Sequence, residues 1–186
     1  MDKPIYKEKF RVRSYGIPSE ESTIFLEIKK KVNGIVYKRR LPVDYSTYEC
    51  WLKSKDFYLR NNVDSNQINE EIFWLFKQHP DLTPQVLISY ERISLFTDEE
   101  VEFRVTFDQK IRFRDTCLDL KKRSGGQLVA PELGVLMEVK AMGAYPLWFV
   151  ELLNKFTVRK SSFSKYAETY KRHLFVQHKE EEIHAI

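Results

Sequence analysis

Cysteine is scarce in this sequence, with only Cys50 and Cys117 among 186 residues. Two cysteines are too few for a disulfide framework or for a zinc site built mainly of thiolates. Long apolar runs are also missing, because the stretch from Ala141 to Val150 ends at Glu151, whereas a membrane-spanning helix needs about 20 apolar residues. The N-terminal residues do not form a signal peptide. These absences predict a soluble, cytoplasmic protein of a reducing compartment, without a membrane span in this chain.

A strong excess of charge of one sign is absent as well. The sequence contains 31 Lys and Arg residues and 27 Asp and Glu residues, which gives a net charge of +4. This net charge is too small to indicate a nucleic-acid partner. No Walker P-loop is present, which excludes a P-loop kinase or ATPase. Internal repeats and Gly/Ser linkers are also lacking, so a single domain is predicted over residues 1–176, followed by a polar tail at residues 177–186.

Hydrophobic periodicity and turn residues predict an antiparallel α+β fold. Strands are expected at Tyr6–Tyr15, Ile24–Val32, Ile35–Leu41, Val86–Leu95, Val101–Asp108 with an extension to Arg114, and Leu133–Lys140. Helices are expected at Asp44–Leu52, Ser65–Lys77, Pro146–Phe156 and Ser164–Arg172. In the third of these helices, Trp148 and Phe149 are expected on the packing face. Hairpins with inserted helices are typical of an antiparallel sheet.

The dipeptide Asn33-Gly34 is a strong hairpin signal, and it fixes a register. If the two residues form the whole loop, Lys29 lies opposite Lys38 on the neighbouring strand, and Glu27 lies opposite Arg40. Like charges that face each other across two strands are destabilising. A bound anion would relieve that repulsion.

The later strands show the same tendency. Matching their polar faces would bring Arg92 opposite Arg104, given a connection of three or five residues. The strand that ends at Lys140 carries Glu138 on the same face. Closing such strands into a barrel would gather the bases inside, where they would suit a polyanion, with carboxylates holding a divalent cation on its phosphates. The alternative is that these are ordinary solvated faces of a sheet.

Six short segments carry a resemblance to a known family. In order they are Lys9–Arg13, Leu26–Lys29, Tyr90–Arg92, Phe103–Asp108, Leu136–Lys140 and Phe163–Tyr166. The ordered set resembles the catalytic domain of the vacuolar transporter chaperone (VTC) family, which belongs to the triphosphate tunnel metalloenzymes. The resemblance runs from about Lys7 to Lys171. It implies an antiparallel β-barrel, or tunnel, with flanking helices that binds a nucleoside triphosphate or polyphosphate with Mn²⁺ or Mg²⁺.

The resemblance also implies roles for individual residues. Those expected to grip phosphates, and so to take part in both substrate binding and catalysis, are Arg11, Arg13, Lys29, Lys38, Arg92 and Arg104. Glu138 would be the metal ligand, although an internal ion pair is the alternative interpretation of this residue. Lys140 would point into the tunnel, and Lys165 would sit on a helix that closes over the site. Polymerase members of the family transfer the terminal phosphate of ATP to a polyphosphate chain.

One departure from the family pattern concerns the first strands, which normally precede the Lys9–Arg13 strand and are expected to be missing here. A triphosphatase of the same fold and a non-catalytic module that binds polyphosphate or nucleotide therefore remain alternatives to a polymerase. A nucleic-acid partner is not expected, because aromatic residues do not interleave with the basic strands. The family resemblance leaves room for a membrane-protein partner.

Overall fold

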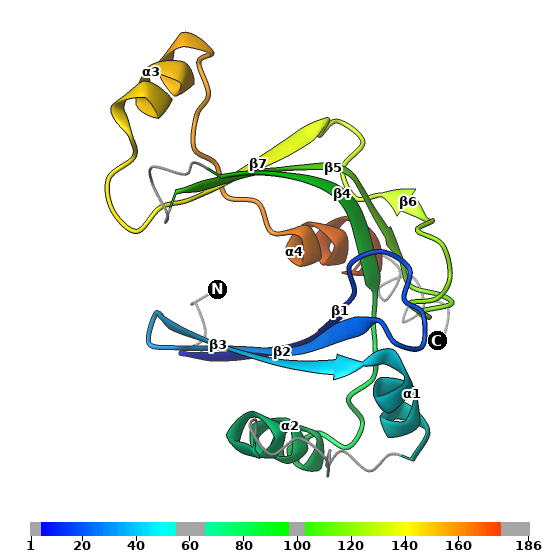
Figure 1. Cartoon of the computed structure of the whole chain (residues 1–186). Helices are drawn as coiled ribbons and strands as arrows, with labels where there is room; N and C mark the ends of the chain where they lie inside the picture. The colour runs from blue at the N-terminus through cyan, green and yellow to red at the C-terminus, as the bar shows by residue number, and fades with distance from the viewer. Residues whose placement is uncertain (1–4, 55–65, 97–102, 176–186) are drawn as a thin grey trace, which may run out of the picture. The chain divides into compact units, whose positions relative to one another are not determined.

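The structure is a computed structural model that describes residues 5–54, 66–96 and 103–175. It divides into two compact units. Unit 1 comprises Met1–Pro84 with Asp119–Arg123, and unit 2 comprises Gln85–Leu118 with Ser124–Ile186. Each unit contains one antiparallel sheet with helices, so the predicted mixed α+β class with antiparallel strands is confirmed (Figure 1).

Unit 1 is a three-stranded sheet with two helices. The strands are β1 (Tyr6–Arg13), β2 (Thr23–Val32) and β3 (Ile35–Asp44), in the order β1-β2-β3, and the helices are α1 (Tyr45–Ser54) and α2 (Asn66–Gln78). β3 continues past the predicted end at Leu41 through Pro42, which is tolerated because β3 is an edge strand of this sheet. The predicted helix start at Ser65 lies outside the described residues.

The hairpin between β2 and β3 has the predicted two-residue turn. Asn33 and Gly34 have φ values of 47° and 88°, and a type I′ turn requires positive φ at both central residues. The register that follows pairs Lys29 with Lys38 and Glu27 with Arg40, so both predicted cross-strand pairs are confirmed.

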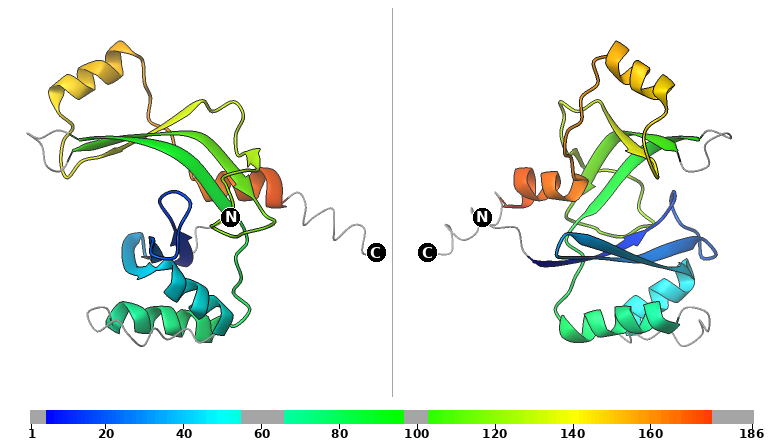
Figure 2. Two further views of the ribbon diagram at one scale, coloured as in Figure 1. Left: turned by 45° about the vertical axis from the view of Figure 1, so that its right-hand side comes forward. Right: turned by 90° about the vertical axis from the view of Figure 1, so that its left-hand side faces the viewer.

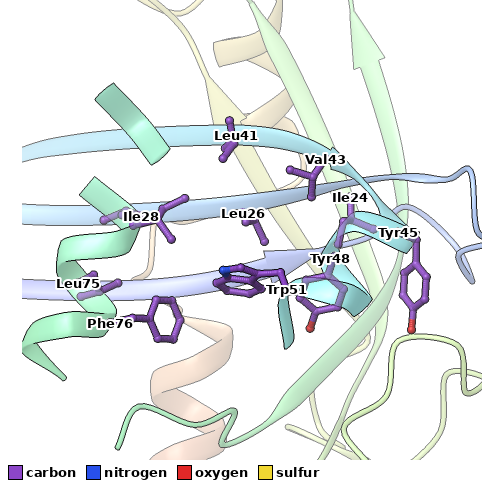
Figure 3. Close-up of a cluster of buried hydrophobic side chains, with 11 residues drawn as sticks. Ile24, Leu26, Ile28, Leu41, Val43, Tyr45, Tyr48, Trp51, Leu75 and Phe76 are labelled. Atoms are coloured by element: carbon purple, nitrogen blue, oxygen red, sulfur yellow. The ribbon is translucent and has the colours of Figure 1, made fainter. Parts of the chain in front are cut away.

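The core of unit 1 lies on one face of its sheet (Figure 3). Its strand residues are Ile24, Leu26, Ile28, Leu41 and Val43, and the helices add Tyr45, Tyr48, Trp51, Ile72, Leu75 and Phe76. Trp51 of α1 meets Phe76 of α2 edge to face, with ring centroids 5.3 Å apart. Because residues alternate along a strand, burying this face turns the intervening residues to the opposite side.

Asp44 forms the start of α1, as its predicted position at the head of that helix implies. Its carboxylate accepts hydrogen bonds from the Ser46 hydroxyl at 2.6 Å and from the Thr47 backbone N–H at 2.7 Å. These bonds lower the pKa of Asp44 to about 2. Asp44 therefore satisfies donors that the first turn of α1 leaves open.

Unit 2 contains a four-stranded sheet, in which β5 has three neighbours. The strands are β4 (Leu87–Phe96), β5 (Arg104–Arg114), β6 (Gln127–Leu128) and β7 (Val135–Lys140), and β5 pairs with each of the others. The helices are α3 (Leu147–Lys155), α4 (Lys165–Thr169) and the π-helical turn η2 (Tyr170–Leu174) (Figure 2). Residues 101–102 of the predicted strand and the predicted tail lie outside the described residues.

The predicted pairing of Arg92 with Arg104 is wrong. Arg92 lies opposite Asp108, and Arg104 lies opposite Phe96, so the register is displaced by four residues along β5. A connection of three or five residues centres the predicted turn on residue 98, whereas the observed β4–β5 pairs are centred on residue 100. The polar faces do coincide, but a base meets a carboxylate instead of a second base.

A bulge divides β5 into two parts with different faces. The register with β4 shifts between Ser89 and Glu91, and Lys110 on the facing stretch of β5 has a φ of 50°. An extra residue in one strand reverses the alternation beyond it. Arg112 and Arg114 therefore lie on the face opposite to Arg104, and they do not extend its line of charges.

α3 packs on the apolar face of this sheet. Phe149 is buried against Phe103, with ring centroids 5.0 Å apart, and Val105 belongs to the same cluster. Phe149 is thus on the packing face, as predicted. Trp148 is 46% exposed, so its prediction as a packing residue holds only for the edge that touches Phe103. None of the helices among the described residues is long and apolar enough to cross a membrane.

Candidate functional site

The sheet of unit 1 carries basic side chains on the face that its core leaves open, and we call this surface the basic face of unit 1. Strand register arranges its members in rows across all three strands. One row is Lys9, Lys29 and Lys38, and the next is Arg11, Glu27 and Arg40. The same alternation places Lys7, Arg13 and Lys31 on this face.

The lysine row places three positive charges side by side. Burial lowers the pKa of Lys9, and the positive charges of Lys7 and Lys29 lower it further. Within the described ranges, neither Lys29 nor Lys38 forms an ion pair with a carboxylate. Like charges on adjacent strands destabilise a sheet, so this row is better suited to a bound anion than to an empty surface.

Glu27 holds the arginines of the next row in place. Arg11 Nε donates to Glu27 Oε2 at 2.7 Å, and Arg40 donates to Oε1 from Nε at 2.9 Å and from Nη2 at 2.7 Å. Arg13 Nε lies 3.5 Å from the same Oε1. Burial alone would raise the pKa of Glu27, but the hydrogen bond from Arg11 and the charges of Arg11 and Arg13 hold it below its ordinary value.

The hydrogen bonds that Glu27 accepts limit its role in the site. Its two oxygens accept from guanidinium groups, so the carboxylate orients those groups and has no oxygen left for a metal ion. Guanidinium groups retain further N–H donors when one edge is occupied, and they bind phosphate well. Rows of oriented Arg and Lys side chains can therefore hold successive phosphate groups of one chain.

In unit 2, a cluster of alternating charges surrounds Asp108 of β5, which is completely buried. Arg92 of β4 binds both of its oxygens, with Nε to Oδ1 at 2.6 Å and Nη2 to Oδ2 at 2.7 Å. Lys165 Nζ, from the first residue of α4, lies 2.6 Å from Oδ2. Burial would raise the pKa of Asp108, but the hydrogen bonds from Arg92 and Lys165 keep it low. The bond to Asp108 also raises the pKa of Arg92.

Glu138 of β7 joins the same cluster. Lys165 Nζ lies 2.7 Å from Glu138 Oε1, and Arg92 Nη2 lies 3.5 Å from Oε2. Both cations also lie over the ring of Tyr90, Lys165 at 4.7 Å and Arg92 at 5.2 Å from its centroid. The ion-pair interpretation of Glu138 thus describes its contacts in this structure, and Lys165 bridges the two carboxylates.

Arg104 and Lys140 extend this surface, which we call the charged face of unit 2. They are direct partners on β5 and β7 and lie on the side of the sheet that carries Asp108 and Glu138. Arg104 also lies over the ring of Phe96, 5.8 Å from its centroid. Four cations and two carboxylates of the described residues therefore share this face.

The predicted site residues fall into two groups. Arg11, Arg13, Lys29 and Lys38 lie together on the basic face of unit 1. Arg92, Arg104, Glu138, Lys140 and Lys165 lie together on the charged face of unit 2.

Lys9, Arg40 and Asp108 belong to these surfaces but were not among the predicted site residues. Strand alternation was the signal for Lys9 and Asp108, because each shares a face with a predicted residue. For Arg40 the signal was the hairpin register, which already paired it with Glu27.

On the charged face of unit 2, the described part of the chain offers a divalent cation one accessible carboxylate, that of Glu138. The described residues contain no group of three or more His, Cys, Asp or Glu side chains suited to a metal ion. Asp108 is enclosed by Arg92 and Lys165, whereas 39% of the Glu138 side chain is exposed. One carboxylate with waters and phosphate oxygens is a usual environment for Mg²⁺. Glu138 could therefore hold an ion that arrives with a phosphate chain.

Comparison with known proteins gives a family assignment. The family model for the VTC domain matches residues 1–174, which cover all of unit 1 and unit 2 as far as Leu174. No curated protein matches the chain.

Proposed function

Because the chain belongs to the VTC domain family, we propose that it is a polyphosphate polymerase domain, which transfers the terminal phosphate of ATP to a polyphosphate chain. The observation that carries the proposal is the row of Lys9, Lys29 and Lys38 on the basic face of unit 1. A polyphosphate carries a negative charge on every phosphate, so it can neutralise several of these side chains at once. The enclosed tunnel expected from the family is part of this proposal.

The proposed reaction needs positioning and charge neutralisation more than a protein nucleophile. A terminal oxygen of the acceptor chain attacks the γ-phosphorus of ATP, the bond to the β–γ bridging oxygen breaks, and ADP leaves with that electron pair. Charge accumulates on the transferred group and on the leaving oxygen, and preorganised cations stabilise both. Arg11 and Arg13, already oriented by Glu27, supply such cations in unit 1.

The charged face of unit 2 contributes a second set of groups to the proposal. Arg92, Arg104 and Lys140 would bind phosphate oxygens, and Lys165 would exchange a carboxylate partner for a phosphate. Mn²⁺ or Mg²⁺, when bound, would neutralise charge on the phosphates, and Glu138 is the residue that would hold it. Asp108 would keep Arg92 in position, since it binds both edge nitrogens of that guanidinium group.

One observation favours the non-catalytic binding module as the alternative to a polymerase. Among the described residues, Glu138 alone offers an exposed carboxylate on the charged face of unit 2, and Lys165 and Arg92 already contact it. A module that binds polyphosphate or nucleotide without turning it over would need no more than the basic side chains. A triphosphatase would use the same groups with water as the acceptor.

One assay separates the three functions. The purified chain is incubated with ATP and Mn²⁺ or Mg²⁺, and both polyphosphate and free phosphate are measured. A polymerase makes polyphosphate, a triphosphatase releases only phosphate, and a binding module does neither while tripolyphosphate still raises its melting temperature. Absence of both products together with absence of a melting shift would contradict the whole proposal.

The variant Glu138→Gln tests the proposed metal ligand. We expect it to abolish metal-dependent turnover of ATP and to leave metal-free binding of tripolyphosphate unchanged, because removing a negative charge does not repel an anion. Glu151→Gln, an exposed glutamate on α3, is the matched control and should retain full turnover. Full turnover by Glu138→Gln would remove this residue from the proposed metal site.

A further inference from the structure

The α3 segment, which we define as residues 142–160, exposes an unusual amount of apolar surface. Met142, Leu147 and Phe156 are 79%, 74% and 68% exposed. Further large apolar side chains of the segment that are exposed by 42% or more are Tyr145, Trp148, Leu152 and Val158. Single exposed apolar residues are normal on a protein surface, but a continuous stretch of them marks an interaction surface.

This apolar surface extends beyond the face that anchors α3, and two of its members, Tyr145 and Trp148, also contact Phe103. Phe149 and Leu153 pack against the sheet of unit 2, in a cluster with Phe103 and Val105. Since Leu147 and Phe156 lie outside that cluster, they do not contribute to the core of the unit. Figure 1 shows α3, in gold, projecting beyond the strands of unit 2, with its far side uncovered by other described elements of that unit.

The charges of the segment are predominantly positive. Lys155, Arg159 and Lys160 are exposed and oppose one acidic residue, Glu151. None of the four forms an ion pair with another described residue. The Lys155 ammonium lies 5.8 Å from the centre of the Phe156 ring, so a basic and an aromatic side chain extend together.

We propose that the α3 segment docks on an anionic lipid surface, with Leu147, Trp148 and Phe156 in the interfacial layer and Arg159 and Lys160 against the headgroups. Leucine and aromatic residues combined with Lys and Arg are typical of helices that lie in a membrane interface. A protein partner is a poorer match, because protein interfaces are depleted of lysine. α3 would lie on the surface, since no described helix is long enough to cross it.

Vesicle binding tests this proposal. The full chain is mixed with vesicles of phosphatidylcholine alone and with vesicles that contain about 30% phosphatidylserine, and bound protein is recovered by flotation. We expect binding to the second kind and little to the first. Since the basic face of unit 1 would also attract anionic vesicles, the contribution of α3 is measured as the difference between matched variants.

The variant Phe156→Asp tests the apolar contact, and Phe96→Asp is its matched control. The two phenylalanines are 68% and 67% exposed, and each lies near a cation, but Phe96 is on β4 opposite Arg104, away from the face that α3 covers. We expect Phe156→Asp to weaken vesicle binding about tenfold and Phe96→Asp to leave it unchanged. Equal binding by Phe156→Asp and the wild type would overturn the proposal.

The headgroup contacts are tested by charge reversal. Arg159→Glu with Lys160→Glu should lower binding to phosphatidylserine vesicles by about tenfold or more, because each cation contributes near a charged surface. Lys122→Glu with Arg123→Glu, an exposed basic pair in a loop of unit 1, is the control and should have a small effect. Equal losses in both double variants would assign the binding to net charge and overturn the assignment to α3.

The depth of Trp148 gives an independent readout. Brominated acyl chains quench tryptophan fluorescence, and we expect quenching of the wild type that is lost in Trp148→Phe. Sedimentation without lipid tests the alternative of a second copy of the chain on the same surface. Two results together would contradict lipid docking: the chain forms a dimer that the variant Phe156→Asp dissociates, and the tryptophan quenching is the same in Trp148→Phe as in the wild type.

Discussion

At the scale of single residues, two carboxylates hold five of the cations on the candidate surfaces, three around Glu27 and two around Asp108. Both are buried: Glu27 binds arginines from the two neighbouring strands, and Asp108 binds Arg92 of the neighbouring strand and Lys165 of α4. A buried carboxylate is costly unless it is paired and hydrogen-bonded, so each must keep its cations close. The same bonds fix the directions of the guanidinium groups, which is what a phosphate site requires.

Replacing Asp108 should destabilise the fold in a pH-dependent manner. Asp108→Asn leaves Arg92 and Lys165 without their buried counter-charge, so we expect a loss of about 3 kcal/mol at pH 7 in urea unfolding. Because the folded pKa of Asp108 is depressed, its stabilisation is present above its unfolded pKa near 4 and is lost as the pH falls through the folded value. The difference in the free energy of unfolding between the variant and the wild type should therefore become smaller in acid.

An exposed aspartate supplies the control for that measurement. Asp81→Asn should change the free energy of unfolding by less than about 0.5 kcal/mol, both at pH 7 and in acid, because Asp81 lies on the surface. A loss for Asp108→Asn no larger than the loss for Asp81→Asn would contradict the role assigned to the buried pair.

Lys9 should show the opposite behaviour, in which a binding residue reduces stability. Lys9→Gln removes one of three adjacent positive charges, so we expect a gain of about 0.5 kcal/mol without ligand. Because the folded pKa of Lys9 is lowered, its penalty is present below that pKa and disappears as the pH rises through it towards the unfolded value. The gain should thus be seen at pH 7 and vanish above about pH 10.5.

The same variant should bind tripolyphosphate more weakly than the wild type, as measured by the melting shift. Lys122→Gln, which alters an exposed lysine away from the row, serves as the reference. A loss of stability for Lys9→Gln would show that Lys9 is held by favourable contacts and not by repulsive ones.

At the scale of elements, turn chemistry determines how far a strand pairing can be derived from a sequence. The β2–β3 register could be predicted because Asn33-Gly34 permits one kind of two-residue turn. The β4–β5 register could not, because residues 97–103 contain no such signal and each added pair of loop residues shifts the pairing. That shift concealed the pairing of Arg92 with Asp108.

The β2–β3 turn should be sensitive to a single methyl group. Gly34 has a φ of 88° with open space around the position of a Cβ, so Gly34→Ala meets no clash but places a side chain in an unfavourable backbone region. We expect a loss of about 1 kcal/mol in thermal unfolding. Gly143→Ala, at a glycine with equal space and no positive φ, should cost little or nothing. Equal effects would contradict the turn assignment.

At the scale of the whole chain, the residue pattern predicted the mixed α+β class with antiparallel strands, while contacts across elements lay beyond it. Lys165 was assigned to a short helix near the site, and the structure places it against Asp108 and Glu138. No periodicity reveals such a bridge, because it depends on where α4 packs. Trp148 was predicted to pack, but 46% of it is exposed, for a similar reason. An apolar helix face predicts burial, but it does not tell which surface covers the residue.

The two charged surfaces should respond to salt as polyanion sites do. Binding of tripolyphosphate to the full chain should weaken steadily as salt is raised, because the attraction between Lys29, Lys38 and phosphate is screened. The melting shift measured at two salt concentrations checks this. A shift that salt leaves unchanged would indicate binding through uncharged contacts.

The central claim is that the lysine row of unit 1 binds a chain of phosphates, and calorimetric titration with tripolyphosphate tests it most directly. We expect the double variant Lys29→Ala with Lys38→Ala to bind at least about tenfold more weakly than the wild type, a loss of about 1.4 kcal/mol. The charge-matched control, Lys122→Ala with Lys160→Ala, removes two exposed lysines outside the sheet and should keep an affinity close to that of the wild type. An affinity for the Lys29 and Lys38 variant equal to that of the control would contradict the claim.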